Sequence, residues 1–372
     1  MRIVVQIVQW LVGLLFIFSG LVKTIDPIGF AYKLEDYFAP EVLDLPFLIP
    51  FSLPMSIFFV IFEVLLGVLL ILGIWKRWTF IMLLALIIFF TFLTFYSAYY
   101  DKVTDCGCFG DAIKLEPWQS FYKDVILLVA LIFLWVNKKY IYPLLNRPYA
   151  ELALLLSFLG SAYIAYHGLQ HLPLIDFRAY KVGDNIVHNM KSADELGKEP
   201  TRTQTMYHLR NTVNNSKIRV SSDEFVANDN YWKSGTVWEV EKTDTRVVSK
   251  GYEPPIRDFS IDCDGEDQLH EYMTMPRLVM IITYKPEKVS TAAQQRVETL
   301  IEDLQAQNIP VISLVSNPYE IGGLQPCFAD DKALKTVIRS NPGIVAVSGG
   351  TVVAKYHHND TPDAASLIAK FP

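Results

Sequence analysis

The sequence predicts a membrane-embedded helix bundle, followed by a small β-rich connector and a C-terminal α/β domain. Long apolar runs crowd the first 170 of the 372 residues, whereas charged residues crowd the remainder. Short β-prone stretches follow the last apolar run, and apolar strands then alternate with amphipathic helices. The expected boundaries are residues 1–170 for the bundle, 171–252 for the connector and 253–372 for the C-terminal domain.

Five segments are long and apolar enough to cross a hydrocarbon core about 30 Å thick, which takes about 20 helical residues. They are expected near Ile3–Val22, Met55–Ile74, Phe80–Ala98, Trp118–Val136 and Tyr149–Leu169. The first is interpreted as a retained span rather than a cleaved secretory signal, because no clear small-residue cleavage site follows it. We therefore expect a multi-pass protein in contact with the lipid bilayer.

Basic residues are concentrated on one side of these spans, and an excess of Lys and Arg marks the cytoplasmic side. That side would carry Arg2, Lys76, Arg77, Lys138, Lys139 and Arg147. Loops on the other side mix fewer lysines with many acids. With an odd number of spans, this contrast predicts a bacterial inner-membrane protein with a cytoplasmic N-terminus and a periplasmic C-terminal domain. All four cysteines would then face the oxidising side.

The polar stretch after the last span is expected to form short strands, since β-prone runs there are broken by Gly, Asn and Ser. These runs are Thr205–Leu209, Lys217–Val220 and Thr236–Val240. Beyond Pro254 the pattern becomes β-α-β-α-β-β-α, in which helices separate apolar strands. Its elements are expected at 278–284, 291–307, 309–316, 331–340, a strand pair turning at Gly349 and Gly350, and 363–371. Such an order is typical of a layered α/β domain.

The β-α-β-α-β-β-α order, with Pro342 opening the late strand in NPGIVAV, resembles the thioredoxin fold. In that family this proline follows a cis peptide bond and lies opposite the reactive cysteines. A working thioredoxin carries Cys-x-x-Cys where a central strand gives way to a helix. The corresponding stretch here, TYKPEKVSTAAQ, has no cysteine. The resemblance therefore implies a degenerate thioredoxin-like domain that binds or positions a partner.

Two cysteines, Cys263 and Cys327, lie in expected loops of this domain. Three interpretations remain open for them, because sequence alone does not reveal disulfide connectivity. They pair with each other, they pair with the membrane part, or they are buried as small hydrophobic residues.

The other two cysteines, Cys106 and Cys108, stand one glycine apart in TDCGCFGDA, between the third and fourth spans. As a redox pair they would close a very small ring, and strained, exposed disulfides are the exchangeable ones. As metal ligands they would need further donors, and the loop offers no His or additional Cys, so no metal site is predicted. As structural residues they would pair with Cys263 or Cys327, or simply pack. The pattern favours the redox interpretation.

Glu63 is the only ionisable residue expected within the second span, where a charge is costly unless it is paired or neutralised. One interpretation makes it a proton carrier when electrons pass from the thiols to a membrane quinone held among the helices. The other makes it a neutral carboxyl group that hydrogen-bonds Ser19 or Lys23.

Histidines occur in two pairs. His167 and His171 lie one helical turn apart and would share a face suited to a metal or haem, but no third ligand is evident. They are interpreted as polar anchors at the membrane interface. His357 and His358, at the end of the last expected strand, are predicted to be solvated.

The membrane part resembles the DoxX and MauE group of redox-associated membrane proteins. The resemblance covers about residues 1–140 and depends on FSGLVKTIDPIGFAYKLEDYF, FEVLLGVLLILG and DCGCFGD. With the added thioredoxin-like domain, the chain resembles a fused form found in Bacteroidetes. This resemblance implies a role near periplasmic disulfide chemistry, since MauE is linked to maturation of a cysteine-rich amine dehydrogenase subunit.

We therefore expect thiol–disulfide or electron transfer through Cys106 and Cys108, with a thiol-containing periplasmic client docked by the terminal domain. Activity as a membrane-linked oxidoreductase remains open against a non-catalytic scaffold or assembly factor with structural cysteines. Solute transport would require several polar residues within the bundle, where little is evident beyond Glu63. A net charge of -6 without a basic block argues against a nucleic-acid partner. Hydrolase and phosphate-loop motifs are absent from the sequence.

Overall fold

The computed structural model describes residues 1–372 except 101, 103–106, 114 and 258. Its chain divides into two compact units. Unit 1 comprises Met1–Asp184 and Ser260–Pro372, and unit 2 comprises Asn185–Phe259. Unit 1 thus contains both the apolar helices and the C-terminal sheet.

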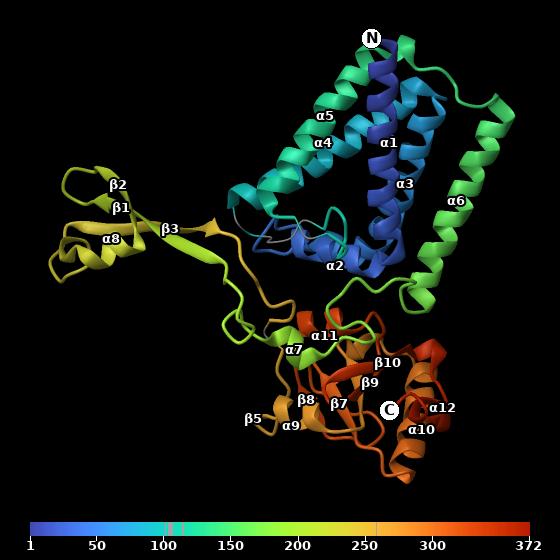
Figure 1. Ribbon diagram of the computed structural model, residues 1–372, viewed down its shortest axis with the longest axis vertical. Helices are drawn as coiled ribbons and strands as arrows, with labels where there is room; N and C mark the ends of the chain where they lie inside the picture. The colour runs from blue at the N-terminus through green and yellow to red at the C-terminus, as the bar shows by residue number, and fades with distance from the viewer. Residues whose placement is uncertain (101, 103–106, 114, 258) are drawn as a thin grey trace. The chain divides into compact units, whose positions relative to one another are not determined.

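Among the described residues of unit 1, five helices are long and apolar enough to cross a membrane, which confirms the number predicted (Figure 1). They are α1 (Arg2–Ile25), α3 (Ser52–Leu72, extended by the 3-10 turn η1, Pro46–Phe51), α4 (Lys76–Tyr100), α5 (Pro117–Val136) and α6 (Arg147–Gln170). α1 packs mainly on α3, and α4 packs mainly on α5. Most side chains of α6 are not buried, so this helix presents a broad apolar surface that suits lipid.

Small residues bring α1 and α3 into backbone contact. A Cβ atom at Gly67 of α3 would lie 2.8 Å from the carbonyl oxygen of Gly13, and one at Gly20 would lie 2.9 Å from the backbone nitrogen of Val64. In lipid, helices associate through such close van der Waals packing because apolar burial gives little driving force. The α1–α3 pair is therefore the contact of the bundle at which the helix backbones approach closely.

A short helix, α2 (Pro27–Phe38), crosses the end of the bundle (Figure 1). Asp26 caps it, since Asp26 Oδ1 accepts a hydrogen bond from Gly29 N at 2.8 Å, and Pro27 begins it. Its apolar face packs Phe30, Leu34, Tyr37 and Phe38 against Val60 and Leu93. No helix was predicted here, because 12 residues are too few for a span.

The C-terminal part of unit 1 is a seven-stranded mixed sheet in the order β10-β9-β6-β7-β8-β4-β5. Its strands are β4 (Asp262–Cys263), β5 (Glu266–Asp267), β6 (Leu278–Thr283), β7 (Val311–Val315), β8 (Pro326–Phe328), β9 (Gly343–Ser348) and β10 (Thr351–His357). β6, β7 and β8 are parallel, whereas β9 runs antiparallel to β6 and to β10. Every residue of β6 is buried, as expected for an interior strand that lies between β9 and β7.

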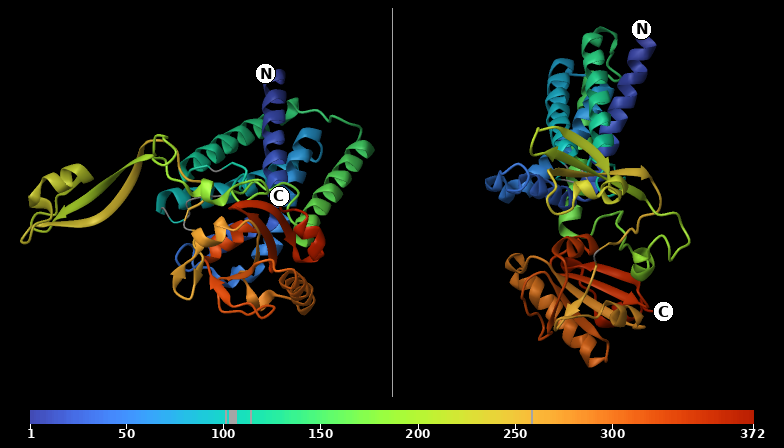
Figure 2. Two further views of the ribbon diagram at one scale, coloured as in Figure 1. Left: turned by 60° about the horizontal axis from the view of Figure 1, so that its bottom comes forward. Right: turned by 90° about the vertical axis from the view of Figure 1, so that its left-hand side faces the viewer.

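Four helices accompany this sheet: α9 (Leu269–Thr274), α10 (Thr291–Ala306), α11 (Asp331–Val337) and α12 (Ala364–Ile368). α10 and α12 lie side by side (Figure 2), and their apolar residues share a core with β6 and β9. A C-terminal α/β region, as predicted, is therefore confirmed. Short 3-10 turns are η2 (Lys138–Tyr140), η4 (Pro286–Lys288) and η5 (His358–Asp360) in this unit.

Unit 2 contains a three-stranded antiparallel sheet in the order β2-β1-β3. Its elements are α7 (Ile186–Met190), β1 (Arg202–Asn211), β2 (Lys217–Ser221), α8 (Ser222–Ala227), η3 (Asp229–Tyr231) and β3 (Trp238–Ser249). All three predicted strands are present. β3 begins two residues after the predicted Thr236 and ends nine residues after the predicted Val240. The prediction stopped early because the second half of β3, EKTDTRVVS, is polar and lacks the apolar alternation that marks a half-buried strand.

Candidate functional site

The loop that joins α4 to α5 contains the predicted redox pair. Cys106 lies outside the described residues, whereas Cys108 lies within them. The Cys108 carbonyl oxygen accepts a hydrogen bond from Ser19 Oγ of α1 at 2.8 Å. Gly107 and Gly110 both have positive φ angles, +66° and +53°, and Gly110 N donates to Gly107 O at 3.0 Å. Glycine tolerates this backbone, so the loop turns tightly where Ser19 anchors it.

Glu63 of α3 forms a buried ion pair with Lys23 of α1. Lys23 Nζ lies 2.5 Å from Glu63 Oε2, and both residues are at most 4 % exposed. The rings of Phe30 and Phe90 flank the ammonium group, with centroids 5.4 and 5.2 Å from Nζ. Lys23 is one of the two partners that the sequence suggested. Because it stands four residues after Ser19, the ion pair lies about 6 Å along α1 from the anchor of the cysteine loop.

A second buried acid, Asp124 of α5, has two partners. Its Oδ1 lies 2.8 Å from Lys123 Nζ, and its Oδ2 accepts a hydrogen bond from Thr94 Oγ1 of α4 at 3.0 Å. Asp124 is 1 % exposed. Sequence reasoning missed this residue, although an ionisable side chain inside the predicted fourth span carries the same signal as Glu63 in the second.

Both ion pairs line one cavity in the bundle, together with Ser19 and Cys108. The cavity measures about 30 Å³, which is room for about one or two water molecules. A cavity that accepts a benzene ring measures about 150 Å³. The cavity is therefore too small for the ring of a membrane quinone.

A polar junction ties the sheet to the helices within unit 1. Arg339, 5 % exposed, donates from Nε to Asp26 Oδ2 at 2.8 Å and from Nη2 to Asp111 Oδ2 at 3.1 Å. Burial alone would lower the pKa of Arg339, but the carboxylates of Asp26 and Asp111 raise it above its ordinary value. Lys285 adds a second contact, because its Nζ lies 3.2 Å from Glu35 Oε1 of α2. These contacts could not be predicted from the sequence, because the partners are more than 200 residues apart in the chain.

The ring of Tyr32 lies at the centre of this junction. The ammonium groups of Lys285 and Lys335 both lie 4.9 Å from its centroid, and the guanidinium carbon of Arg339 lies 5.5 Å away. Burial first, and then the neighbouring Tyr284, raise the pKa of the Tyr32 hydroxyl. Tyr32 therefore stays neutral and offers its ring face to three cations.

Pro342 lies beside the junction. The Asn341–Pro342 peptide bond is cis, as the thioredoxin resemblance implies. The Asn341 side chain accepts hydrogen bonds from Tyr284 N and Lys285 N and donates to Lys285 O at 2.7 Å. Asn341 thus holds the turn after β6, where the sequence lacks Cys-x-x-Cys, and Lys285 of that turn contacts α2.

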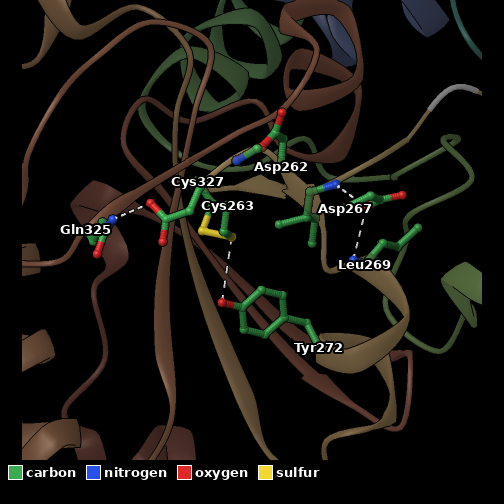
Figure 3. Close-up of a disulfide and its surroundings, with 10 residues drawn as sticks. Asp262, Cys263, Asp267, Leu269, Tyr272, Gln325 and Cys327 are labelled. Atoms are coloured by element: carbon green, nitrogen blue, oxygen red, sulfur yellow. Dashed lines mark hydrogen bonds between the residues drawn. A yellow bond between two sulfur atoms is a disulfide. The ribbon is translucent and has the colours of Figure 1, made fainter.

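Cys263 and Cys327 form a disulfide with each other (Figure 3). They join β4 to β8 across a sequence separation of 64 residues, and both are buried. The Tyr272 hydroxyl lies 3.7 Å from Cys263 Sγ. Of the three interpretations left open by the sequence, the structure selects mutual pairing.

The histidine pairs occupy different surroundings. His171 Nδ1 lies 2.7 Å from Asp360 Oδ1, and the His167 ring centroid lies 4.8 Å from that of His171. Among the described residues, no group of three or more His, Cys, Asp or Glu side chains could hold a metal ion.

His357 was wrongly predicted to be solvated. It is 3 % exposed, because the chain turns at η5 after the end of β10. Asn359 N donates to His357 Nδ1 at 3.1 Å, and burial lowers the pKa of His357 to about 4. His357 is the last residue of β10, and a position at the end of a strand can still be buried.

Comparison with known proteins places the membrane part near one family. The family model described as Methylamine utilisation protein MauE matches residues 1–137. This stretch contains α1 to α5 and the cysteine loop. The match and the five apolar helices together indicate a multi-pass membrane protein in contact with lipid. No curated protein and no solved structure matches the chain.

Proposed function

We propose that this protein exchanges disulfides with a client at the periplasmic rim of the inner membrane, through Cys106 and Cys108. The observation that carries the proposal is the anchoring of Cys108 to Ser19, about one helical turn from the buried Lys23–Glu63 pair and beside a cavity with room for water. Buried ion pairs in membrane spans are expensive and usually mark function. The likeness to MauE over residues 1–137 agrees with a membrane protein tied to redox chemistry.

The exchange balances without a further oxidant. A client thiolate attacks one sulfur of the Cys106–Cys108 disulfide, the bond between these two sulfurs breaks, and a mixed disulfide forms. A second client thiolate then attacks the mixed disulfide and releases the loop. The client dithiol loses two electrons and two protons, and Cys106 and Cys108 gain both as thiols. The reverse sequence reduces a client disulfide.

Glu63 is proposed to exchange one of these protons with cavity water. In this role it accepts a proton when a client thiol ionises and returns it when a loop thiolate is released. Lys23 would hold the carboxylate in place in the meantime, because its ammonium group lies 2.5 Å from Glu63 Oε2. A group that only exchanges protons is neither consumed nor reduced.

The C-terminal domain is proposed to be a thioredoxin-like module that docks the client and leaves the redox chemistry to the membrane loop. Support comes from the order of β6, β7, β9 and β10 and from the cysteine-free turn after β6. The Arg339–Asp111 hydrogen bond also holds this domain close to the cysteine loop, since Asp111 stands three residues after Cys108. A client bound next to Pro342 would therefore lie close to the cysteine loop.

Thiol trapping in intact cells tests this proposal. Free thiols are blocked before lysis, and the peptide that carries Cys106 and Cys108 is analysed by mass spectrometry. We expect its oxidation state to follow the growth conditions, and Cys108→Ser to accumulate mixed disulfides with a client. A Cys263→Ser/Cys327→Ser variant is the control, and it should not trap that client.

Two outcomes would contradict the proposal. A constant oxidation state, with a Cys106→Ser/Cys108→Ser variant that still complements a deletion strain, would favour a scaffold with structural cysteines. Labelling of the loop by a membrane-impermeant maleimide only after the cytoplasmic side is opened would overturn the periplasmic orientation.

A further inference from the structure

The cavity in the bundle contains two carboxylates, and they are not equivalent. Glu63 faces Lys23, which is 3 % exposed in its side chain, whereas Asp124 faces Lys123, whose side chain is 22 % exposed. A proton on Glu63 would leave the deeply buried Lys23 ammonium group facing a neutral carboxyl group, so cavity water would have to solvate that charge. A proton on Asp124 would leave the Lys123 ammonium group facing a neutral carboxyl group. The Lys123 side chain is 22 % exposed, so its charge is less completely desolvated than that of Lys23. Asp124 is therefore the acid whose lysine partner is the less deeply buried of the two.

Thr94 makes both protonation states of Asp124 acceptable. Its hydroxyl lies 3.0 Å from Asp124 Oδ2 and also 3.0 Å from the Phe90 carbonyl oxygen. A hydroxyl group has one proton to donate and can accept in return. With Asp124 ionised, Thr94 donates to the carboxylate. With Asp124 protonated, the carboxyl group donates to Thr94 Oγ1, and Thr94 donates to Phe90 O instead. No buried hydrogen-bonding group loses its partner in either state.

The cysteine loop contacts this second ion pair directly. Lys123 Nζ lies 5.1 Å from the ring centroid of Phe109, the residue after Cys108. Cys108, Lys123 and Asp124 all line the same cavity, whose volume admits water. A proton thus has a short route between the loop and Asp124 through one or two water molecules.

We propose that Asp124 is a proton-exchange residue for the Cys106–Cys108 pair, with Thr94 as its positioning residue. This inference rests on the proposed function. As a client thiol attacks, its S–H bond breaks and cavity water delivers the proton to the Asp124 carboxylate. As the loop disulfide breaks, the released thiolate takes a proton back from the Asp124 carboxyl group. The electron pair passes from the client sulfur to the loop sulfur, and Asp124 is unchanged at the end.

The rate of exchange as a function of pH tests this assignment. The full chain is placed in lipid nanodiscs, the Cys106–Cys108 disulfide is reduced with dithiothreitol, and the reaction is quenched with maleimide for mass mapping. Asp124→Asn keeps a side chain that can hydrogen-bond Thr94 but cannot accept the proton. We expect it to be at least about tenfold slower than the wild type near pH 6, where the reductant is mostly protonated. At about pH 10, where the reductant is already ionised, the two rates should converge.

The controls separate catalysis from damage to the fold. Glu151→Gln, at an exposed acid on α6 that pairs with Arg147, should follow the wild-type curve at every pH. Asp124→Glu should recover part of the rate near pH 6. A loss of rate by the same factor at all pH values would show that Asp124→Asn only misplaces the loop, and it would overturn the inference.

Failure of the inference is distinguishable from failure of the proposed function. A wild-type loop that dithiothreitol does not reduce, with the Cys263–Cys327 disulfide as the internal reference, would contradict disulfide exchange itself. A reactive wild-type loop whose pH curve coincides with that of Asp124→Asn would leave exchange in place and eliminate Asp124 as a proton carrier.

Discussion

Arg339 donates a hydrogen bond to Asp111, three residues beyond Cys108, so the C-terminal sheet region is tied to the cysteine loop through one buried guanidinium group. The same group binds Asp26 at the start of α2. One side chain, two residues after the end of α11, thus contacts both the cysteine loop and the start of α2. Arg339 is the natural first target for substitution.

Arg339→Met should loosen the cysteine loop. Removing one partner of a buried ion pair typically costs about 3–5 kcal/mol, because the remaining charges stay desolvated. We expect a lower thermal midpoint in detergent and faster proteolysis between α4 and α5. Arg147→Met is the matched control, since Arg147 pairs with Glu151 on the exposed face of α6 and should contribute at most about 1 kcal/mol. Equal effects of the two substitutions would show that the junction does not hold the loop.

The Lys23–Glu63 pair should behave as a coupled unit. Lys23→Met and Glu63→Gln each leave one buried charge alone, at about 3–5 kcal/mol, whereas the double variant leaves none. The double variant should therefore be more stable than either single variant. Chemical unfolding in detergent, arranged as a double-mutant cycle, measures the coupling. Additive losses would mean that the two side chains do not interact.

Loss of the Cys263–Cys327 disulfide should destabilise the sheet domain. The bond closes a loop of 64 residues, and removal of a native disulfide typically lowers the free energy of unfolding by about 2–5 kcal/mol. Cys263→Ser/Cys327→Ser should unfold at a lower temperature than the wild type. Reductant should bring the wild type down to the same midpoint and leave the double variant unchanged. A midpoint insensitive to both treatments would contradict a stabilising role.

His357 should make stability depend on pH in the acidic range. Burial lowers its pKa to about 4 in the folded state, whereas an unfolded histidine titrates near about 6.5. Between these values the unfolded state binds the proton more readily, so stability falls as the pH drops from about 6.5 towards 4. Protonation of Nδ1 would also break its hydrogen bond with Asn359 N.

Thermal unfolding across this pH range measures the effect. His357→Asn should flatten the slope, because an amide oxygen can still accept from Asn359 N but does not titrate. His270→Asn, at an exposed histidine in α9, should leave the slope unchanged. A wild-type profile without a slope between pH 6.5 and 4 would show that folding does not lower the pKa of His357.

The elements predicted from sequence are those whose signal is contained in one segment. Each span is a continuous apolar run, and β6 is recognisable because both of its faces are apolar. α2 has no such signal, since its 12 residues bury only one face. The second half of β3 is exposed and polar, so its strand conformation depends on pairing with β1.

The site was predictable only in part, for a related reason. Glu63 stands out because it interrupts an apolar run, and the same reasoning applied to Asp124 would have found the second acid. Arg339 gives no local signal, because Asp26 and Asp111 are distant in sequence and become its partners only on folding. A buried ionic contact of this kind is a property of the tertiary structure.

Asp26 uses its two carboxylate oxygens for two different purposes. Oδ1 caps α2 through Gly29 N, and Oδ2 binds Arg339. A helix cap is worth about 1 kcal/mol, so displacing Arg339 and fraying α2 are thermodynamically linked events. Removing the Asp26 carboxylate should consequently weaken both the start of α2 and the contact of α2 with the sheet region.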